Sequence, residues 1–367
     1  MTIQMFSNSL GEEELQAVKK VFESKWLGAG PETAAFEKEF AEKVGAKYAL
    51  TTNSCTSALF ISMKVLDIGP GDEVIIPTIH FVGAANAIID CGATPVFADV
   101  DPNYLNITAA EIERLRAKNT RAVMLLHYGG HSCDMDAIKD AAAGLYIIED
   151  SANSILSTYK GKYCGTLGDI GCYSFDPMKM LVTGDGGMMT FNRESLYQKA
   201  KLHRYLGIVD QSSGLEAIKA GNDNWWEFDV ACSAGRHVSN DISSAIGRVQ
   251  LKKLDGFIAR RKEIWDMYQD DTSGAFPITP PEPYPLSTSS YYLYWIRSEN
   301  RTEIAKKLFE NGIYTTFRYF PLHMVKKYRS GERLPVAEEI NKIALNLPLH
   351  QNLTNEEVEK IICLLTS

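Results

Sequence analysis

Residues 48–66 read YALTTNSCTSALFISMKVL, and the stretch changes character twice. It opens with a short apolar run of strand type, Tyr48-Ala49-Leu50, and continues through polar and small residues as far as Ser57. Residues 58–66 then have the apolar content of a helix. The first N–H groups of a helix have no partner within it, so a strand, a polar turn and a helix in this order direct N–H groups at an anion. The stretch therefore predicts an anion site on an α/β fold.

The rest of the first half repeats this alternation. Residues 12–24 have the apolar spacing of a helix, and further short strands are expected at 73–76, 95–98, 122–127 and 146–150. Such an alternation is typical of an α/β protein with a largely parallel sheet, in which ligands gather at the carboxyl ends of the strands.

The pattern changes near residue 240. From Asp241 onward, apolar residues at helical spacing predict one long helix, and the proline-rich residues 277–285 are interpreted as a connecting loop. A chain of 367 residues is long enough for two packed domains. We therefore expect a large domain over residues 1–240 and a smaller domain over 241–367 that begins with the long helix.

Composition excludes several classes of protein. With 45% hydrophobic and 23% charged residues, the chain is typical of a globular protein, and its formal net charge of -8 argues against a basic nucleic-acid-binding face. None of the seven cysteines forms a C-x-x-C pair, and the sequence has neither a signal-peptide pattern nor an apolar run long enough to span a membrane. These features predict a reduced, cytoplasmic protein that binds neither nucleic acid nor membrane. The histidines are scattered, so no metal site is expected.

One lysine, Lys179, lies between a strand-like segment that ends near Ser174 and the glycine-rich turn Gly184-Asp185-Gly186-Gly187. A lysine that is desolvated in a pocket has a lowered pKa and can form a Schiff base with a carbonyl compound. Taken alone, such a lysine is more often an ordinary surface residue. Its partners elsewhere in the chain decide between the two interpretations.

A carboxylate, Asp150, stands at the end of the apolar strand 146–150. A lone aspartate at that place is most often a cap of a turn or helix, and it can also bind a metal or act as a base. An aspartate for a protonated ring nitrogen and a lysine for an aldehyde are the pair that pyridoxal phosphate requires. Asp150 and Lys179 together therefore indicate a pyridoxal-phosphate site.

The chain resembles the DegT/DnrJ/StrS family of sugar aminotransferases, which are fold-type I pyridoxal-phosphate enzymes. The resemblance runs along essentially the whole chain and includes the Asp150 and Lys179 segments. It implies a large domain with a mostly parallel seven-stranded sheet between helices and a smaller C-terminal α+β domain. The other matching stretches are WLGAGP (26–31), NSCTSAL (53–59), GPGDEVIIP (69–77), GATPVFADV (92–100), HYGGH (127–131), PLH (321–323) and LPLH (347–350).

The resemblance also implies roles for individual residues. Lys179 would hold the cofactor as a Schiff base and then move the proton between substrate and cofactor, and Asp150 would keep the ring nitrogen protonated. The phosphate would be bound by Cys55, Thr56, Ser57 and Ser174 at a helix N-terminus.

The resemblance implies further contacts with the cofactor and with the substrate. Phe81 would stack on the cofactor ring, and Asn153 stands where relatives have Gln or His near the ring hydroxyl. Arg236 replaces an Asn that reaches the partner subunit's cofactor phosphate in many relatives, and an arginine suits a phosphate by bidentate hydrogen bonding. The residues implied to contact substrate are Trp26, Leu27 and His323.

The resemblance thus predicts a homodimeric aminotransferase that uses pyridoxal 5'-phosphate, with pyridoxamine 5'-phosphate between its half-reactions. Glutamate or glutamine would supply the amine, and a keto sugar attached to a nucleotide would receive it, in amino-sugar biosynthesis of the lipopolysaccharide or O-antigen kind. Three alternatives stay open: a free sugar acid or cyclitol ketone as acceptor, a sugar dehydratase, and a non-catalytic sensor. Dehydratases of the family have His in place of the lysine, so Lys179 argues against that activity.

Overall fold

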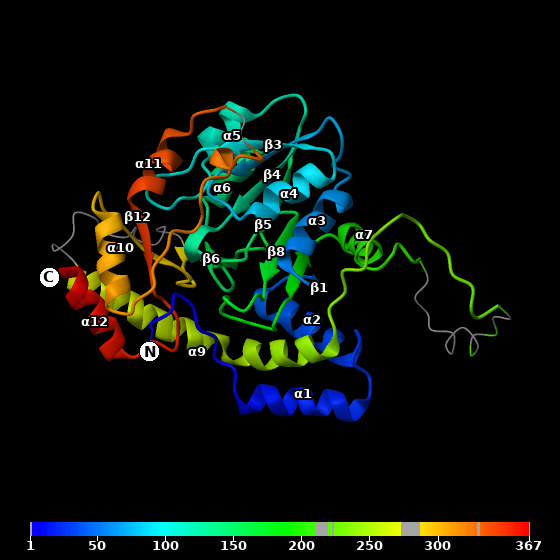
Figure 1. The fold of residues 1–367 in the computed structure, drawn as a ribbon. Coiled ribbons are helices and arrows are strands. Elements are labelled where there is room, and N and C mark those ends of the chain that lie inside the picture. The colour runs from blue at the N-terminus through cyan, green and yellow to red at the C-terminus, as the bar shows by residue number, and fades with distance from the viewer. Residues whose placement is uncertain are drawn as a thin grey trace.

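The computed structural model describes residues 2–209, 219, 221, 224–272, 287–328 and 331–366 (Figure 1). Its centre is a seven-stranded sheet with the order β1-β9-β8-β5-β4-β2-β3. Neighbouring strands are parallel except at β9, which runs antiparallel to both β1 and β8. The strands are β1 (Tyr48–Thr52), β2 (Glu73–Pro77), β3 (Thr94–Ala98), β4 (Thr120–Leu126), β5 (Tyr146–Asp150), β8 (Ile170–Ser174) and β9 (Gly187–Phe191).

Helices cover both faces of this sheet. Successive residues of β2 and β4 belong alternately to two separate apolar clusters, because side chains of a strand point to opposite faces. The larger cluster is shared with α2 (Pro31–Val44), α3 (Cys55–Val65), α4 (Val82–Asp90) and α7 (Glu194–Arg204). The other cluster is shared with α5 (Ala109–Leu115) and α6 (Met135–Ala141). Burial on both faces explains why the strand sequences are nearly continuous apolar runs.

Helix α9 (Asp241–Thr272) begins at the predicted residue and packs beside α1 (Glu12–Ser24) and α2. The Asp241 carboxylate accepts hydrogen bonds from the backbone N–H groups of Gly30 and Thr33 at 2.8 and 2.9 Å, and so joins the start of α9 to that of α2. Farther along, Leu254 lies in the large core and Ile264 in the core of the C-terminal part. Because α9 contributes to both cores, the division at residue 240 stays a prediction.

The C-terminal part has α and β elements of its own. Strands β11 (Tyr294–Arg297) and β12 (Ala344–Leu347) pair antiparallel, with α10 (Arg301–Glu310), α11 (Pro335–Ile343) and α12 (Asn355–Thr366) around them. Smaller elements are the sheet β10-β6-β7 (Ser287–Thr288, Thr158–Tyr159 and Lys162–Tyr163) and the 3-10 turns Tyr128–Gly130 and Leu322–Met324. The predicted fold class is confirmed. The expected connecting loop at 277–285 lies outside the described residues.

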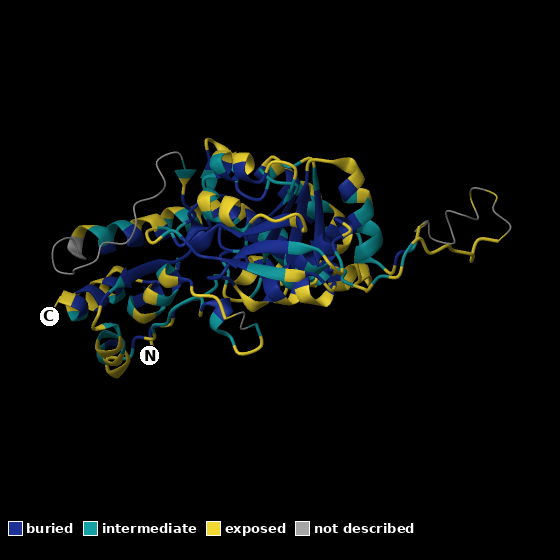
Figure 2. Cartoon of the chain, turned by 90° about the horizontal axis from the view of Figure 1, so that it is seen from above, coloured by how far each residue is buried: buried dark blue, intermediate teal, exposed yellow. Residues whose placement is uncertain are grey.

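One segment leaves the compact body. Figures 1 and 2 show residues 224–240, which lead into α9, extending away from the body, and most of these residues are exposed. Trp226 and Phe228 on this segment are 62% and 67% exposed. Large aromatic side chains at such exposure are typical of a protein surface that contacts another chain.

Candidate active site

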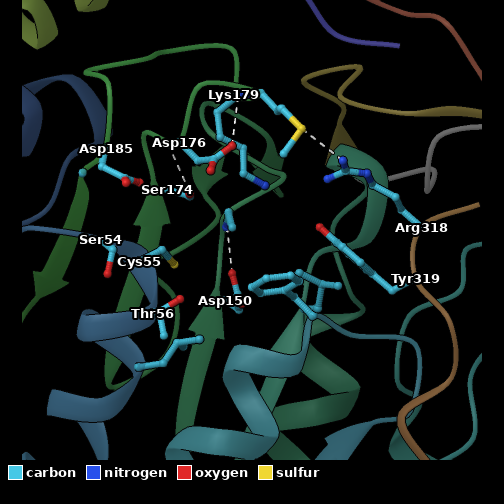
Figure 3. A pocket seen from close by; sticks show the side chains of 16 residues that line it. Ser54, Cys55, Thr56, Asp150, Ser174, Asp176, Lys179, Asp185, Arg318 and Tyr319 are labelled. Carbon is cyan, nitrogen blue, oxygen red and sulfur yellow. Dashed lines mark hydrogen bonds between the residues drawn. The ribbon is translucent and has the colours of Figure 1, made fainter. Parts of the chain in front are cut away.

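A pocket of about 670 Å³, open to solvent, lies at the carboxyl ends of the parallel strands (Figure 3). Asp150 and Ser174 reach it as the last residues of β5 and β8. Thr56 and Phe81 reach it from the segments that follow β1 and β2, and Asp185 from the turn before β9. The location is the one at which open α/β sheets bind ligands. The other lining residues are Ser54, Cys55, Leu59, Leu126, Ala152, Asp176, Met178, Lys179, Gly186, Arg318 and Tyr319.

The N-terminus of α3 forms one wall of this pocket. Ser54 caps the helix by accepting a hydrogen bond from the Ser57 N–H at 3.1 Å, which starts the helix at Cys55, three residues earlier than the sequence predicted. The N–H groups of Cys55 and Thr56 have no acceptor among the described residues. A helix of 11 residues that presents two unpaired N–H groups at a pocket is suited to an anion. The predicted phosphate ligand Ser57 is not among the lining residues, and its N–H is bonded within the cap.

A glycine brings α3 this close to the sheet. A Cβ atom at Gly187 would lie 2.5 Å from the carbonyl carbon of Ser54 and 2.6 Å from the nitrogen of Cys55. Only glycine leaves room for that approach, and the glycine-rich turn therefore shapes the anion site from the side opposite the helix.

The Asp150 carboxylate is buried, and both of its oxygens have partners. Its Oδ2 lies 3.0 Å from Nε2 of His80, and its Oδ1 accepts the N–H of Ala152 at 2.9 Å. These contacts hold the carboxylate at the base of the pocket. The sequence prediction did not include His80, although its position shortly after β2 and next to Phe81 was a signal that it lies at this edge of the sheet.

Lys179 extends into the pocket from the turn after β8. Its Nζ donates to the hydroxyl of Tyr292 at 3.3 Å and lies 4.7 Å from the centre of that ring. Burial alone lowers the pKa of the Lys179 ammonium, but Tyr292, Tyr319 and Asp150 raise it, and the net shift is upward. Burial also raises the pKa of Tyr292. The expectation of a lowered lysine pKa is therefore wrong for this site as it stands.

Two other predicted cofactor residues lie beside the pocket. Phe81 is 51% exposed on its rim and lies 5.9 Å from the ring of Tyr319. Asn153 is buried behind the lining, and neither atom of its side-chain amide has a hydrogen-bond partner among the described residues. An unpaired buried amide is suited to a polar group bound nearby.

The remaining predicted residues lie outside this lining. His323 is buried, with Nδ1 2.6 Å from the Thr78 hydroxyl. Trp26 and Leu27 are 59% and 42% exposed near the starts of α2 and α9, and Arg236 is exposed with its guanidinium over the ring of Tyr205 at 5.6 Å. Their predicted roles require either a movement of these groups or a second chain.

Two lining residues that the prediction missed come from the C-terminal part. The backbone N–H of Arg318 donates to Oδ1 of buried Asn346 at 2.7 Å, and its carbonyl accepts from the hydroxyl of Tyr128. These bonds position Arg318 and Tyr319 in the pocket wall. The sequence contains one indication that they belong to the site: they stand just before PLH (321–323), a stretch that resembles the family.

Comparison with known proteins identifies the family. The sequence model of the DegT/DnrJ/EryC1/StrS aminotransferase family matches residues 8–366. The chain belongs to this family. The chain is 44% identical to dTDP-4-dehydro-2,3,6-trideoxy-D-glucose 4-aminotransferase from Saccharopolyspora spinosa, with 98% of this chain and 94% of the relative covered. As a member of the family, the protein is an enzyme, a sugar aminotransferase.

Solved structures of similar proteins agree. The aminotransferase TlmJ from Streptoalloteichus hindustanus has a TM-score of 0.94 and 44% identity, over 100% of this chain and 98% of that one. Spr1654 from Streptococcus pneumoniae, solved in a PLP-form, has a TM-score of 0.91 and 26% identity over 100% and 98% of the two chains, and a PMP-form is also solved. The predicted cofactor, pyridoxal phosphate, is confirmed.

The residues of this site fit that cofactor. The N–H groups of Cys55 and Thr56 are unpaired donors that can bind a phosphate. Burial raises the pKa of the Cys55 thiol, so the thiol stays neutral and does not repel an anion. Asp150 is a buried carboxylate for the ring nitrogen, and the unpaired amide of Asn153 is available for a ring substituent. Over the described ranges, no group of three or more metal-binding side chains is present, and no helix there is long and apolar enough to cross a membrane.

Proposed function

We propose that this sugar aminotransferase moves the amine of glutamate or glutamine to the keto carbon of a sugar linked to a nucleotide. In the net reaction the donor becomes a 2-keto acid and the ketone of the sugar becomes a primary amine. The observation that carries the proposal is the meeting of Lys179, Asp150 and the N-terminus of α3 in one pocket. The nucleotide is supported by the Saccharopolyspora spinosa relative, whose name gives a dTDP-linked keto sugar.

Several predicted residues have a physical task in this proposal. When bound, pyridoxal phosphate takes up the donor's nitrogen and accepts the electron pair left on the donor's carbon. The N–H groups of Cys55 and Thr56, with the hydroxyl of Ser174, would bind the phosphate. Asp150 would hold a proton on the ring nitrogen, and Phe81 would cover one face of the ring.

Lys179 would hold the cofactor and then move a proton. Tyr292, Tyr319 and Asp150 together raise the pKa of the Lys179 ammonium in the structure. A protonated ring nitrogen against Asp150 would compensate that carboxylate and so lower the pKa of Lys179 toward a value at which the amine accepts a proton. Tyr292, 3.3 Å from Nζ, would orient the amine.

We also propose that the active enzyme is a homodimer in which each chain completes its partner's site. Arg236, Trp26 and Leu27 lie outside the pocket of their own chain, and the segment that bears Trp226 and Phe228 projects from the body with large exposed side chains. A second copy would cover these aromatic residues and bring Arg236 to the phosphate. The domain division, the cytoplasmic location and a place in lipopolysaccharide or O-antigen synthesis stay predictions.

Mixing two inactive variants tests the shared site. If Arg236 serves the partner's phosphate, a dimer with Lys179→Ala in one chain and Arg236→Ala in the other has one intact site and one site with both defects. Equal mixing after dissociation is expected to restore about one quarter of the wild-type activity, because half of the dimers are mixed and each has one working site. The measurement is the transamination rate, with sedimentation to confirm dimers. No recovery from well-mixed dimers would place both residues in one chain's site.

A two-step spectroscopic experiment tests the acceptor. Glutamate first converts the enzyme to its pyridoxamine form, and the visible absorption of the lysine-bound cofactor disappears. Keto sugars linked to nucleotides, free keto sugar acids and cyclitol ketones are then added separately. Recovery of the visible band with a nucleotide-linked keto sugar is the expected result, and recovery with only the free ketones would replace this acceptor by the alternative one.

A further inference from the structure

Arg318 is a cation of the pocket without an anionic partner. Its Nη2 lies 3.1 Å from Sδ of Met178, and its guanidinium carbon lies 4.7 Å from the ring centre of Phe6. Neither contact supplies a negative charge, and no carboxylate lies within ion-pair distance of this side chain in the part of the chain that the structure describes. The planar guanidinium, with its fork of donors, is therefore available for a ligand.

The backbone holds this cation in place. Both the N–H and the carbonyl of Arg318 are bonded, to Asn346 and to Tyr128, and these two partners are buried. The Phe6 ring below the guanidinium also stacks on Tyr292, with 5.7 Å between centroids, and Tyr292 is the residue that contacts Lys179. The structure thus prepares the charge before a ligand binds, which lowers the entropy lost on binding.

The charge lies close to the reacting amine. Met178, which contacts the guanidinium, is the neighbour of Lys179 in the chain, and Figure 3 shows both cationic side chains reaching into the pocket. An α-amino acid that replaces the lysine's nitrogen carries its carboxylate carbon only about 2.5 Å from its own nitrogen. A group that binds this carboxylate must therefore lie near Nζ of Lys179. Arg318 meets this requirement through Phe6, whose ring contacts the guanidinium and stacks on Tyr292, the residue that contacts Nζ.

The other charges of the pocket make such a group necessary. Asp176 and Asp185 line it, and each repels an incoming carboxylate. Lys179 cannot balance them during the reaction, because its nitrogen is the one that the donor displaces. Arg318 is the remaining cation of the lining.

We propose that Arg318 binds the α-carboxylate of the amino donor. The proposal rests on the proposed function for the existence of a donor half-reaction, and adds the residue that selects the donor. A nucleotide diphosphate is a less suitable partner for Arg318, because the guanidinium adjoins the lysine turn at the reacting end of the substrate.

The test compares two donors that differ only in the α-carboxylate. The holoenzyme is mixed with L-glutamate or with isoglutamine, in which the α-carboxylate is a carboxamide, and loss of the visible band gives kcat/KM for each. Arg318→Gln is expected to lower kcat/KM for glutamate by about 10- to 100-fold and to change that for isoglutamine by less than about threefold. Arg318→Lys keeps the positive charge but loses the paired N–H donors of the guanidinium, so its kcat/KM for glutamate should lie between those of the wild type and Arg318→Gln. Calorimetry should show weaker binding of 2-oxoglutarate to Arg318→Gln.

Arg121→Gln is the matched control, since Arg121 is 49% exposed at the start of β4, far from the pocket along that strand. It should leave both donors unchanged. Equal losses for both donors with Arg318→Gln, or a matching loss in the keto-sugar half-reaction, would overturn the assignment. If no α-amino acid converts the wild type while an aminated cofactor still reacts with a keto sugar, the inference fails and the proposed acceptor stands. If glutamate reacts but no keto sugar does, the acceptor fails and the Arg318 comparison remains decisive.

Discussion

Replacing Lys179 with alanine is expected to lower the rate of amine transfer by at least about 10³-fold, within the range that a positioned acid–base group contributes. The reason is geometric, since Lys179 is the amine of the pocket and Tyr292 holds it at 3.3 Å. The variant should also lack the visible absorption of a lysine-bound cofactor. Single-turnover mixing with glutamate measures the rate, and the absorption spectrum of the loaded protein measures the bond to the lysine.

Lys160→Ala is the control for this experiment. Lys160 is 47% exposed and pairs with Asp136 at the surface, so its loss should change neither spectrum nor rate. Methylamine added to Lys179→Ala supplies a small amine for the space that the side chain leaves, and partial recovery of the rate would show that the fold of the pocket is intact. A Lys179→Ala protein that keeps the visible band and half of the wild-type rate would remove the lysine from the mechanism.

The parts of this molecule that were predictable from sequence are those that depend on local pattern. Strand β5 has the predicted bounds, and α9 begins at Asp241, because apolar periodicity is encoded in adjacent residues. The amide oxygen of Asn240 accepts the Ser243 N–H at 2.9 Å and so caps the start of α9. Asp150 and Lys179 were also predictable, since Asp150 ends β5 and Lys179 lies in the turn after β8, and the carboxyl ends of parallel strands meet at one edge of the sheet. The start of α3 was placed late because Ser54 was read as turn rather than as its cap.

The parts that the sequence left out depend on contacts between distant segments. Arg318 reaches the pocket because Asn346 and Tyr128, from two other elements, hold its backbone. The upward pKa shift of Lys179 depends on Tyr292 and Asp150, which no pattern around residue 179 reveals. The effect of burial on the pKa of Lys179 was predictable from sequence, but the neighbouring groups that outweigh burial were not.

Asp150→Asn is expected to slow the donor half-reaction by about 10- to 10³-fold at neutral pH, because an opposite charge nearby raises the pKa of a cationic group by about one to three units. Asparagine has nearly the same shape and can still accept the Ala152 N–H, but it removes the negative charge beside His80. Without that charge the ring nitrogen binds its proton less tightly. The measurement is the single-turnover rate with glutamate as a function of pH.

The pH dependence separates this role from a structural one. Lower pH returns the proton to the ring nitrogen, so the ratio of variant to wild-type rate should rise as the pH falls, whereas a distorted pocket would lower the rate by a constant factor. Asp136→Asn, at a side chain that is 57% exposed and paired with Lys160, should match the wild type throughout. A pH-independent deficit in Asp150→Asn would assign the carboxylate to holding His80 and Ala152 in place. A deficit that closes toward acid would assign it to holding the cofactor's proton.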